Sequence, residues 1–342
     1  MVTAITLEVD GRDVRLSSPD KVYFPDLGLT KRDIAEYFLA VGEGLLAGLR
    51  DRPTTMERWP GGVVADAESF YQKHAPKNTP DWVRTARVTF PSGRTARQVA
   101  PADLASVLWM ANLGTLRFHP WPVRVPDTDR VDLLRVDLDP QPGTGFDQVR
   151  EAAYALRGVL ADAGLTGWVK TSGGRGLHVY APVAGGGFVD ARHAVIAIGR
   201  EVARRHPDLG TVNWWKEERG KRIFVDYNQM ARDRLMASPY SVRPVAQARV
   251  SMPLTWDGLD GVRPDDFTVR TVPGLIADRG DAWAGLAEAE PGSIDVALEW
   301  WADDPTELPY PPDYPKMPGE PPRVPPSRKV EANWDEEGRA RG

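Results

Sequence analysis

Two carboxylates end an apolar run near the middle of the sequence. Asp137 and Asp139 are separated by one residue within residues 134–140. Because side chains on a strand alternate between its faces, both carboxylates should point the same way while Val136 and Leu138 enter the core. Such carboxylates repel one another unless a divalent cation lies between them. The pattern predicts a metal site at the mouth of a strand, with a plain turn or helix cap as the alternative.

A third carboxylate repeats this geometry further along the chain. Asp226 ends the apolar run 223–225. Three carboxylates at strand ends could hold two cations, one at an attacking hydroxyl and one on a triphosphate. Taken alone, Asp226 is as compatible with a helix or turn cap as with a metal ligand.

A glycine-rich turn follows the first pair of carboxylates. Ser172 stands at its start and His178 just after it, and between them lie Gly173, Gly174, Arg175 and Gly176. Glycines allow backbone N–H groups to face an anion, and both the hydroxyl and the imidazole can hydrogen-bond phosphate oxygens. We interpret the segment as a phosphate cradle, although a hairpin turn alone would have the same composition.

Cationic side chains lie close to these motifs in the sequence. Arg219, Lys221 and Arg222 immediately precede the Asp226 strand, and Arg243 follows it. A run of charges is usually a solvated face. Next to the predicted site, contact with a triphosphate or a nucleic-acid template is the functional alternative, and the Arg243 guanidinium suits a phosphate.

Composition limits the class of protein. The 342 residues are 42% hydrophobic and 27% charged, which is typical of a globular protein with one large or two small domains. The absence of cysteine excludes disulfides, thiolate zinc sites and cysteine nucleophiles. No apolar run is long enough to cross a bilayer and no secretory signal is visible, so we expect a cytoplasmic protein without membrane contact. The net charge of −5 argues against nucleic-acid binding over the whole surface, but it allows a local basic groove.

Hydrophobic spacing predicts the elements that position these motifs. Asp10 and Gly11 should turn a hairpin between strands 5–9 and 14–16. Thr30, with Asp33 in the capping-box position, and Asp103 should each begin a helix. Further strands are expected at 54–58, 168–171, 177–181 and 223–226, and further helices at 146–163 and 189–205. Hairpins with glycine turns outnumber clear βαβ units, which favours an α+β fold. Beyond Asp303 the chain is rich in proline, and we expect it to pack lightly or not at all.

Taken together and in this order, the motifs resemble the polymerase domain of bacterial ligase D, a member of the archaeo-eukaryotic primase superfamily. The resemblance runs from about Ser18 to about Ala287. The segments that carry it are residues 20–25, 30–31, 70–73, 112–114, 118–121, 137–140, 170–178, 225–227 and 240–243.

The resemblance implies roles for individual side chains toward a nucleotide. Asp137 and Asp139 would ligate both catalytic metals, manganese or magnesium, and Asp226 the metal at the primer 3′-hydroxyl. Ser172, His178 and Arg243 would hold the triphosphate, together with the intervening turn, while His119 would favour a ribonucleotide through its 2′-hydroxyl and Gln229 would lie near the same nucleotide.

The resemblance also implies DNA contacts and a domain plan. Lys21 and Lys31 would bind a downstream 5′-phosphate at a gap or break, aided by free N–H groups at the start of a helix, and Phe70 and Tyr71 would stack on the template. One catalytic domain would span about 1–302, with an N-terminal α/β module to about 125 and a primase-like, RRM-related core from about 126. Residues 303–342 would form the tail. The chain departs from the usual family pattern at Arg175, at 230–235 and at 245–249.

We therefore expect a DNA-directed nucleotidyltransferase that adds nucleotides, preferably ribonucleotides, to primer or gap ends in repair such as non-homologous end joining. No Lys-x-Asp-Gly ligase motif is present, so a stand-alone polymerase is expected, with a separate DNA ligase and a Ku-type end-binding protein implied by family analogy. The alternatives are a non-catalytic protein that binds or bridges DNA ends, and a primase that starts strands without a primer. A glycosidase is unlikely because Asp137 and Asp139 lie together rather than across a sugar.

Overall fold

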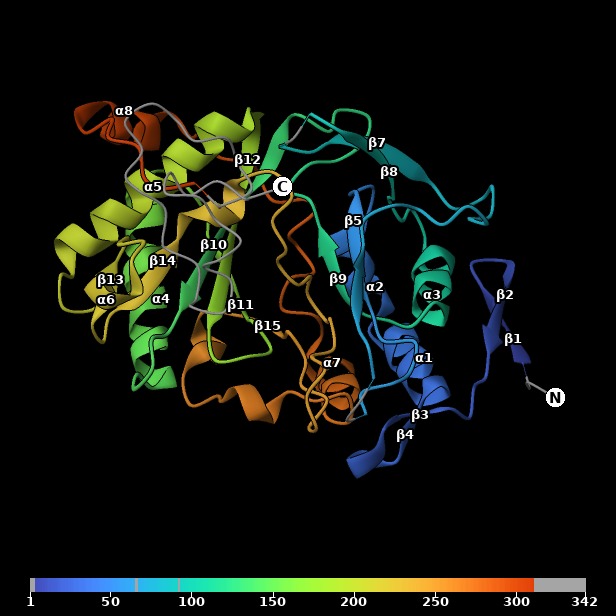
Figure 1. Ribbon diagram of the computed structural model, residues 1–342. Helices are drawn as coiled ribbons and strands as arrows, with labels where there is room; N and C mark the ends of the chain where they lie inside the picture. The colour runs from blue at the N-terminus through green and yellow to red at the C-terminus, as the bar shows by residue number, and fades with distance from the viewer. Residues whose placement is uncertain (1–3, 65–66, 92, 311–342) are drawn as a thin grey trace, which may run out of the picture.

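The structure is a computed structural model that describes residues 4–64, 67–91 and 93–310. Two antiparallel-rich sheets stand side by side, each with helices packed against it, and the N-terminal elements gather at one end of the molecule (Figure 1). The fold is of the α+β class, as the sequence predicts.

The first sheet belongs to the N-terminal part of the chain. Its central strand is β5, which pairs with β6 and β9 over most of its length and with β8 through Thr54 and Val99. The elements of this part are β1 (Ala4–Val9), β2 (Arg12–Ser17), β3 (Val22–Phe24), η1 (Pro25–Leu27), β4 (Leu29–Thr30), α1 (Lys31–Ala40), α2 (Gly42–Leu49), β5 (Thr54–Arg58), β6 (Phe70–Gln72), β7 (Thr85–Thr89), β8 (Thr95–Val99), α3 (Leu104–Asn112) and β9 (Thr115–Pro120).

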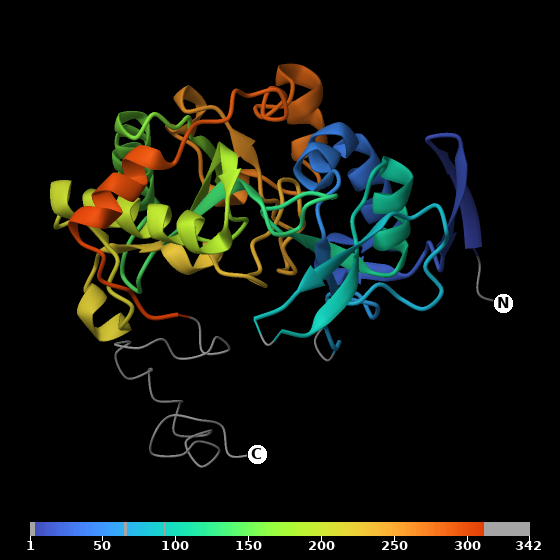
Figure 2. The same ribbon diagram turned by 90° about the horizontal axis from the view of Figure 1, so that it is seen from above.

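The second sheet has the strand order β13-β14-β10-β12-β11-β15, and only the β13–β14 pair is parallel. Helices α4 and α5 cover one of its faces (Figure 2). The elements of this part are β10 (Val131–Asp139), α4 (Phe146–Asp162), β11 (Trp168–Thr171), β12 (Leu177–Gly186), α5 (Phe188–Arg205), β13 (Gly210–Thr211), α6 (Lys216–Arg219), β14 (Ile223–Asp226), η2 (Tyr227–Met230), β15 (Pro253–Leu254), η3 (Asp257–Leu259), η4 (Pro264–Asp266), α7 (Val272–Arg279) and α8 (Asp295–Asp303).

The segment after η2 returns to the N-terminal part and joins the two sheets. The N–H groups of Ser238 and Val242 donate to the carbonyls of Phe118 and Leu116 on β9, at 2.8 and 2.9 Å. The Tyr37 hydroxyl on α1 donates to the carbonyl of Tyr240 at 2.9 Å. One buried hydrophobic cluster consequently runs through both sheets. Residues 238–243 are thus fixed between the sheets, which determines where Arg243 lies.

Most predicted elements are confirmed. The strands at 54–58, 168–171 and 223–226 have the predicted bounds, and β12 continues to Gly186. Thr30 and Asp103 cap their helices, since their side chains accept from the N–H groups of Asp33 and Ser106.

The prediction for the tail is wrong at its start. Residues 304–310 pack against α5, because Arg192 donates to the carbonyls of Leu308 and Pro309 and Tyr310 is buried. Proline removes an N–H donor but leaves its carbonyl as an acceptor, so a proline-rich segment can still be held by a buried guanidinium. The rest of the predicted tail, residues 311–342, lies outside the described residues.

The capping box of α1 generates a prediction about stability. Thr30 makes three hydrogen bonds with Asp33: its N–H and its hydroxyl donate to Asp33 Oδ2, at 2.6 and 2.7 Å, and its Oγ1 accepts from the Asp33 N–H at 3.3 Å. Thr30→Ala should lower the free energy of unfolding by about 1 kcal/mol, because the first turn loses an acceptor. Thr30→Ser keeps the hydroxyl and should behave like wild type in urea unfolding; equal losses in both variants would contradict the assignment.

Candidate active site

Four charged or titratable side chains form a row across four neighbouring strands. In the strand register, Lys170 on β11 faces His178 on β12, His178 faces Asp137 on β10, and Asp137 faces Asp226 on β14. Directly opposed residues in antiparallel strands have their side chains on the same face of the sheet. Asp139 lies two residues beyond Asp137 and therefore on this face too, while Val136 and Leu138 are buried, as the sequence predicts.

The carboxylates of this row disturb one another's protonation. Burial, followed by the charges of Asp226 and Asp139, raises the pKa of Asp137 well above its usual value. Burial also raises the pKa of Asp226, although hydrogen bonds from Gln229 and Asn228 oppose the shift. Buried, clustered carboxylates attract a cation, because a cation supplies the counter-charge that burial denies them and offsets the repulsion of Asp137 by Asp226 and Asp139.

Asp226 is held by the turn that follows it. The Asn228 N–H donates to Asp226 Oδ1 at 2.9 Å, and Gln229 Nε2 donates to Asp226 Oδ2 at 2.9 Å. The turn is anchored to the sheet because Arg135 Nη2 donates to the Gln229 carbonyl at 2.8 Å. Gln229, predicted to lie near a nucleotide, thus contacts the third carboxylate directly.

The glycine-rich turn differs from expectation in one respect. The N–H groups of Gly174 and Gly176 do not lie open to an anion, because both donate to Ser172 Oγ, at 3.1 and 3.2 Å. A hydroxyl that accepts two hydrogen bonds has its own proton left to donate. Ser172 is therefore the group of this turn that is prepared to donate to a phosphate oxygen.

Two glycines of the turn are required by space and backbone conformation. Gly173 has a φ of +71°, which favours glycine. A Cβ on Gly176 would lie 2.4 Å from the Leu138 carbonyl oxygen, so β10 and the turn approach closely only because this residue is glycine. This approach brings the turn beside Asp139, the residue that follows Leu138.

His178 is fixed by a buried lysine that the sequence analysis did not select. Lys170 Nζ donates to His178 Nδ1 at 2.8 Å, and both side chains are buried. Burial, followed by the charge of Lys170, lowers the pKa of His178 well below its usual value. The ring is consequently neutral, and with Lys170 donating to Nδ1 its proton belongs on Nε2, which lies 3.6 Å from Asp137 Oδ1. His178 therefore offers one N–H donor at the mouth of the site.

A cavity of about 330 Å³ lies over the middle of this row, where Asp137 and His178 line it; Lys170 and Asp226 are not among its lining residues. Asp137 and Asp139 line one part of it and Ser172 and His178 another, and arginines supply positive charge around them. A Cβ on Gly174 would lie 3.3 Å from Arg243 Cζ, so the Arg243 guanidinium lies against the turn. The arginines that line the cavity are Arg117, Arg175, Arg243 and Arg249.

Arg117 reaches the cavity from the first sheet, and sequence reasoning missed it. Its Nη1 pairs with Glu57 Oε2 at 2.9 Å, and the same oxygen lies 2.9 Å from His119 Nε2. Arg117 and His119 are two residues apart on β9, so their side chains share a face, and Glu57 lies opposite Arg117 on β5. The i, i+2 spacing beside the predicted His119 is the signal that could have identified Arg117.

His119 itself lies close to the exposed ring of Tyr71. Its ring centroid is 5.9 Å from that of Tyr71, and burial lowers its pKa to about 4, so it is neutral near pH 7. Phe70 and Tyr71 expose 45% and 50% of their surface on β6, as stacking on a nucleic-acid base would require. Their position at the edge of the first sheet agrees with the stacking prediction without testing it.

The predicted phosphate pocket at Lys21 and Lys31 differs from expectation. The N–H groups of Lys31 and Arg32 are not free at the helix start, since they donate to the carbonyls of Lys21 and Pro19. Lys31 Nζ donates to the Ser17 carbonyl at 2.9 Å and to Asn112 Oδ1 at 2.9 Å. Burial, followed by the charges of Lys21 and Arg58, lowers its pKa to about 8. The predicted 5′-phosphate pocket therefore depends on the side chains of Lys21 and Lys31 and has no free N–H groups of Lys31 and Arg32 at the helix start to support it.

The cations before β14 do not act as a group. Arg219 is buried and donates to the carbonyls of Asn213 and Trp214, with its Cζ 3.6 Å from the Phe224 ring centroid. Arg222 donates to the carbonyls of Arg219 and Glu218. Lys221 is exposed. The first two are committed to the loop backbone, so the predicted DNA contact remains open for Lys221 alone.

The carboxylates of the site are the side chains that could ligate a divalent cation. Within residues 4–64, 67–91 and 93–310, no three His, Cys, Asp or Glu side chains form a complete ligand cluster. Asp137, Asp139 and Asp226 nevertheless supply the carboxylate oxygens that Mn²⁺ and Mg²⁺ prefer, and Mg²⁺ sites of this kind commonly use one or two carboxylates plus substrate phosphates. The residues present therefore fit such a cation bound together with a triphosphate.

Carboxylates on the central strands of an antiparallel sheet, beside a cationic glycine-turn pocket, define a domain of the primase-polymerase class. The chain matches the family model described as LigD, primase-polymerase domain, over residues 30–283. It belongs to this family.

Individual relatives agree with this assignment. The multifunctional non-homologous end joining protein LigD of Mycobacterium bovis is 34% identical over 280 residues, which cover 78% of this chain and 36% of that protein. The bifunctional non-homologous end joining protein LigD of Bacillus subtilis is 30% identical over 270 residues, covering 78% and 43%. The chain thus spans less than half the length of these curated relatives.

A solved structure is also similar, the polymerase domain from Mycobacterium tuberculosis ligase D in complex with DNA. It has a TM-score of 0.75 and 31% sequence identity, with 81% of this chain and 98% of that chain covered. Among the helices of the described residues, none has the length and apolar character to cross a membrane.

The turn generates a prediction about anion binding. Ser172→Ala should weaken binding of inorganic tripolyphosphate by about tenfold or more, because a hydrogen bond to a charged group contributes roughly 1.5–3 kcal/mol. Isothermal titration calorimetry measures the change. Ser293→Ala is a matched control, since that hydroxyl also accepts a backbone N–H but lies outside the cavity. Equal affinity in Ser172→Ala and wild type would remove Ser172 from the phosphate site.

Proposed function

We propose that this protein is a DNA-directed nucleotidyltransferase that adds nucleotides, preferably ribonucleotides, to a primer or gap end. The observation that supports the proposal most strongly is the row Lys170–His178–Asp137–Asp226 beside a cationic cavity. The carboxylates Asp137, Asp139 and Asp226 repel anions unless cations are bound, whereas the arginines around the glycine-rich turn attract phosphate. Nucleotidyl transfer needs both properties within one pocket.

The carboxylate end would receive the reacting groups. Asp137 and Asp139 would hold cations on the triphosphate, and Asp226 would hold one beside the primer 3′-hydroxyl. When bound, Mn²⁺ or Mg²⁺ supplies positive charge that stabilises the developing negative charge and favours ionisation of the attacking hydroxyl. The hydrogen bonds from Asn228 and Gln229 keep Asp226 oriented while the hydroxyl approaches.

The other end would hold the leaving group. Ser172 Oγ and His178 Nε2 each present one donor, and the Arg243 guanidinium lies against the same turn. Lys170 acts indirectly, because its hydrogen bond to Nδ1 keeps the His178 proton on Nε2. Such preorganised donors stabilise charge on the departing pyrophosphate without reorienting during the reaction.

Sugar and template recognition would come from the first sheet. Neutral His119, held by Glu57, can hydrogen-bond a 2′-hydroxyl, which is the group that distinguishes a ribonucleotide. Phe70 and Tyr71 offer exposed rings for a template base. The family relationship to a polymerase domain described in complex with DNA supports this assignment.

The relatives' names suggest a role in non-homologous end joining. A Ku-type end-binding protein and a separate DNA ligase are the partners that such a role implies. The second candidate, a non-catalytic protein that binds or bridges DNA ends, is favoured only by the exposed aromatic pair and Lys21, which would serve either role.

Extension of a gapped duplex separates the two candidates. Wild-type protein with Mn²⁺ should add labelled NTP in preference to dNTP, whereas an end-bridging protein adds neither. Asp137→Ala and Asp139→Ala should each reduce addition by at least about a hundredfold, because loss of cation binding removes several kcal/mol of transition-state stabilisation.

Asp147→Ala provides the matched control. This carboxylate is exposed on α4 and pairs only with Arg150 among the described ion pairs. Circular dichroism checks that each variant is folded. Extension by Asp137→Ala at the wild-type rate in saturating Mn²⁺ would exclude the proposed site.

The two lysines generate a pH-dependent prediction. Burial lowers the pKa of Lys31 from 10.5 to about 8, so its charge is present below pH 8 and is lost as the pH rises through this value. A downstream 5′-phosphate should tighten binding to gapped DNA about tenfold at pH 7, and this gain should shrink toward pH 9. Fluorescence anisotropy at fixed salt measures it, with a 5′-hydroxyl gap as control.

The double variant Lys21→Ala/Lys31→Ala tests the origin of this gain. It should bind both gaps with nearly equal affinity at every pH. If the variant still prefers the 5′-phosphate, the phosphate pocket lies elsewhere on the protein.

A further inference from the structure

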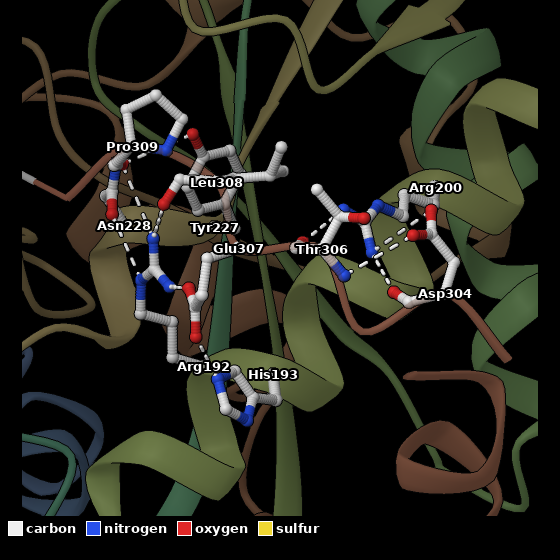
Figure 3. Close-up of polar contacts among 10 residues, drawn as sticks. All are labelled: Arg192, His193, Arg200, Tyr227, Asn228, Asp304, Thr306, Glu307, Leu308 and Pro309. Atoms are coloured by element: carbon white, nitrogen blue, oxygen red, sulfur yellow. Dashed lines mark hydrogen bonds and ion pairs between the residues drawn. The ribbon is translucent and has the colours of Figure 1, made fainter. Parts of the chain in front are cut away.

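The last described residues, 304–310, form a strap that the proposed reaction does not use. The strap follows α8, lies along α5 and ends beside η2, the turn that carries Asn228 (Figure 3). It begins beyond residue 283, where the match to the family model ends. The strap itself therefore lies outside the family-matched residues, although the side chains that it contacts on α5 and η2 lie within them.

One buried arginine holds the strap in place. The Arg192 side chain on α5 is 1% exposed, and its Nη1 donates to Glu307 Oε2 at 2.7 Å. Its Nη2 donates to the Leu308 carbonyl at 2.7 Å. The Arg192 Cζ also lies 3.7 Å from the Tyr310 ring centroid. A buried guanidinium needs a counter-charge and acceptors for its N–H groups, and the strap provides both.

The same arginine and the strap hold the turn after Asp226. Arg192 Nε donates to Asn228 Oδ1 at 3.3 Å, and Asn228 Nδ2 donates to the Pro309 carbonyl at 3.0 Å. The Tyr227 hydroxyl also donates to Pro309, at 3.4 Å. All polar groups of the Asn228 side chain are thus engaged by α5 and the strap (Figure 3). Its backbone N–H is the group that donates to Asp226 Oδ1.

The beginning of the strap has its own attachments to α5. Arg200 donates to the carbonyls of Asp304 and Thr306. His193 pairs with Glu307 and stacks on Trp301 of α8, with the ring centroids 4.0 Å apart and nearly parallel. The strap is consequently attached to α5 at its beginning, through Arg200 and His193, while its end reaches the Asp226 turn through Arg192 and through the Pro309 carbonyl.

We propose that the strap is a positioning element for the third catalytic carboxylate. Glu307 and Arg192 are its positioning residues, which act on Asp226 through Asn228 without touching substrate. Docking of the strap fixes the Asn228 side chain through the Pro309 carbonyl. The fixed residue keeps its backbone N–H oriented toward Asp226 Oδ1. The inference rests on the proposed function for its kinetic readout alone, since the order of the turn can be measured without any reaction.

Hydrogen exchange followed by mass spectrometry tests the proposal on the full chain. In Glu307→Ala, amide exchange in residues 226–230 should rise about tenfold or more relative to wild type, because the turn loses its outer anchor. Exchange in β12, which lies on the other side of β10, should stay unchanged and reports global stability. Mn²⁺ binding, followed by the electron paramagnetic resonance signal of the free ion, should weaken.

Kinetics provide a second readout that a purely structural role would not give. The kcat of nucleotide addition should fall about tenfold, because a misplaced carboxylate misaligns the 3′-hydroxyl. The KM for NTP should change little, since Ser172, His178 and Arg243 contact neither the strap nor α5 in the described structure. Glu307→Gln keeps an acceptor for Arg192 and should recover part of the loss. Glu201→Gln is the matched control, because that carboxylate also pairs with two arginines on α5 but does not contact the strap.

A second variant keeps the test decisive if Glu307→Ala does not fold. Arg200→Ala loosens the beginning of the strap without unpairing a buried charge, and it should raise exchange at 226–230 to a smaller extent. Unchanged exchange at 226–230, or an equal rise in β12, overturns the inference. If wild-type protein adds no nucleotide, the proposed function fails, while exchange and Mn²⁺ binding still decide whether the strap positions Asp226.

Discussion

The register between four antiparallel strands is the constraint on which the rest of the site depends. Pairing of β11, β12, β10 and β14 brings Lys170, His178, Asp137 and Asp226 into one row. A slip of one residue would send each side chain to the opposite face, where α4 and α5 pack. The buried residues that alternate with the row, such as Val136 and Val225, make such a slip costly. Core packing and the geometry of the site are therefore set by the same register.

The row separates charge within a short distance. Carboxylates occupy its β10–β14 end, while the lysine and the neutral imidazole occupy the β11–β12 end. The first sheet adds Arg117 beside the second end and holds it with Glu57, which also holds His119. Glu57 thus orients both Arg117 and His119, which lie on β9 of the first sheet. The segment 238–243 ties the sheets together and brings Arg243 to the same cavity.

The sequence could predict what depends on neighbours along the chain. Short local segments predicted β5, β11 and β14 with the bounds observed, and the caps at Thr30 and Asp103 follow from local hydrogen-bonding chemistry. Alternation along a strand placed Asp137 and Asp139 on one face, and the position of Asp226 at the end of an apolar strand made it a candidate that the family resemblance then supported. The directions of the glycine N–H groups could not be predicted, because they depend on how Ser172 turns its hydroxyl.

Contacts between distant segments could not be predicted either. Lys170 looked like an ordinary strand residue, and its role appears only when β11 pairs with β12. Arg117 depends on Glu57, which is 60 residues away in the sequence. The strap was judged from its prolines, yet its carbonyls and one carboxylate satisfy an arginine on α5. The proline content of a segment does not show whether its carbonyls and carboxylates meet a donor elsewhere in the fold, and that contact decides whether the segment packs.

The strap also has a consequence for the order in which the domain matures. A chain emerges from the ribosome with its N-terminus first, so every strand of the large sheet can pair before Glu307 has been synthesised. During that interval Arg192 has no carboxylate from the strap, and Asn228 lacks the Pro309 carbonyl. The nascent domain can therefore bury its core while the turn after Asp226 is still incompletely anchored. Completion of the strap would then separate the folding of the core from the final ordering of this turn.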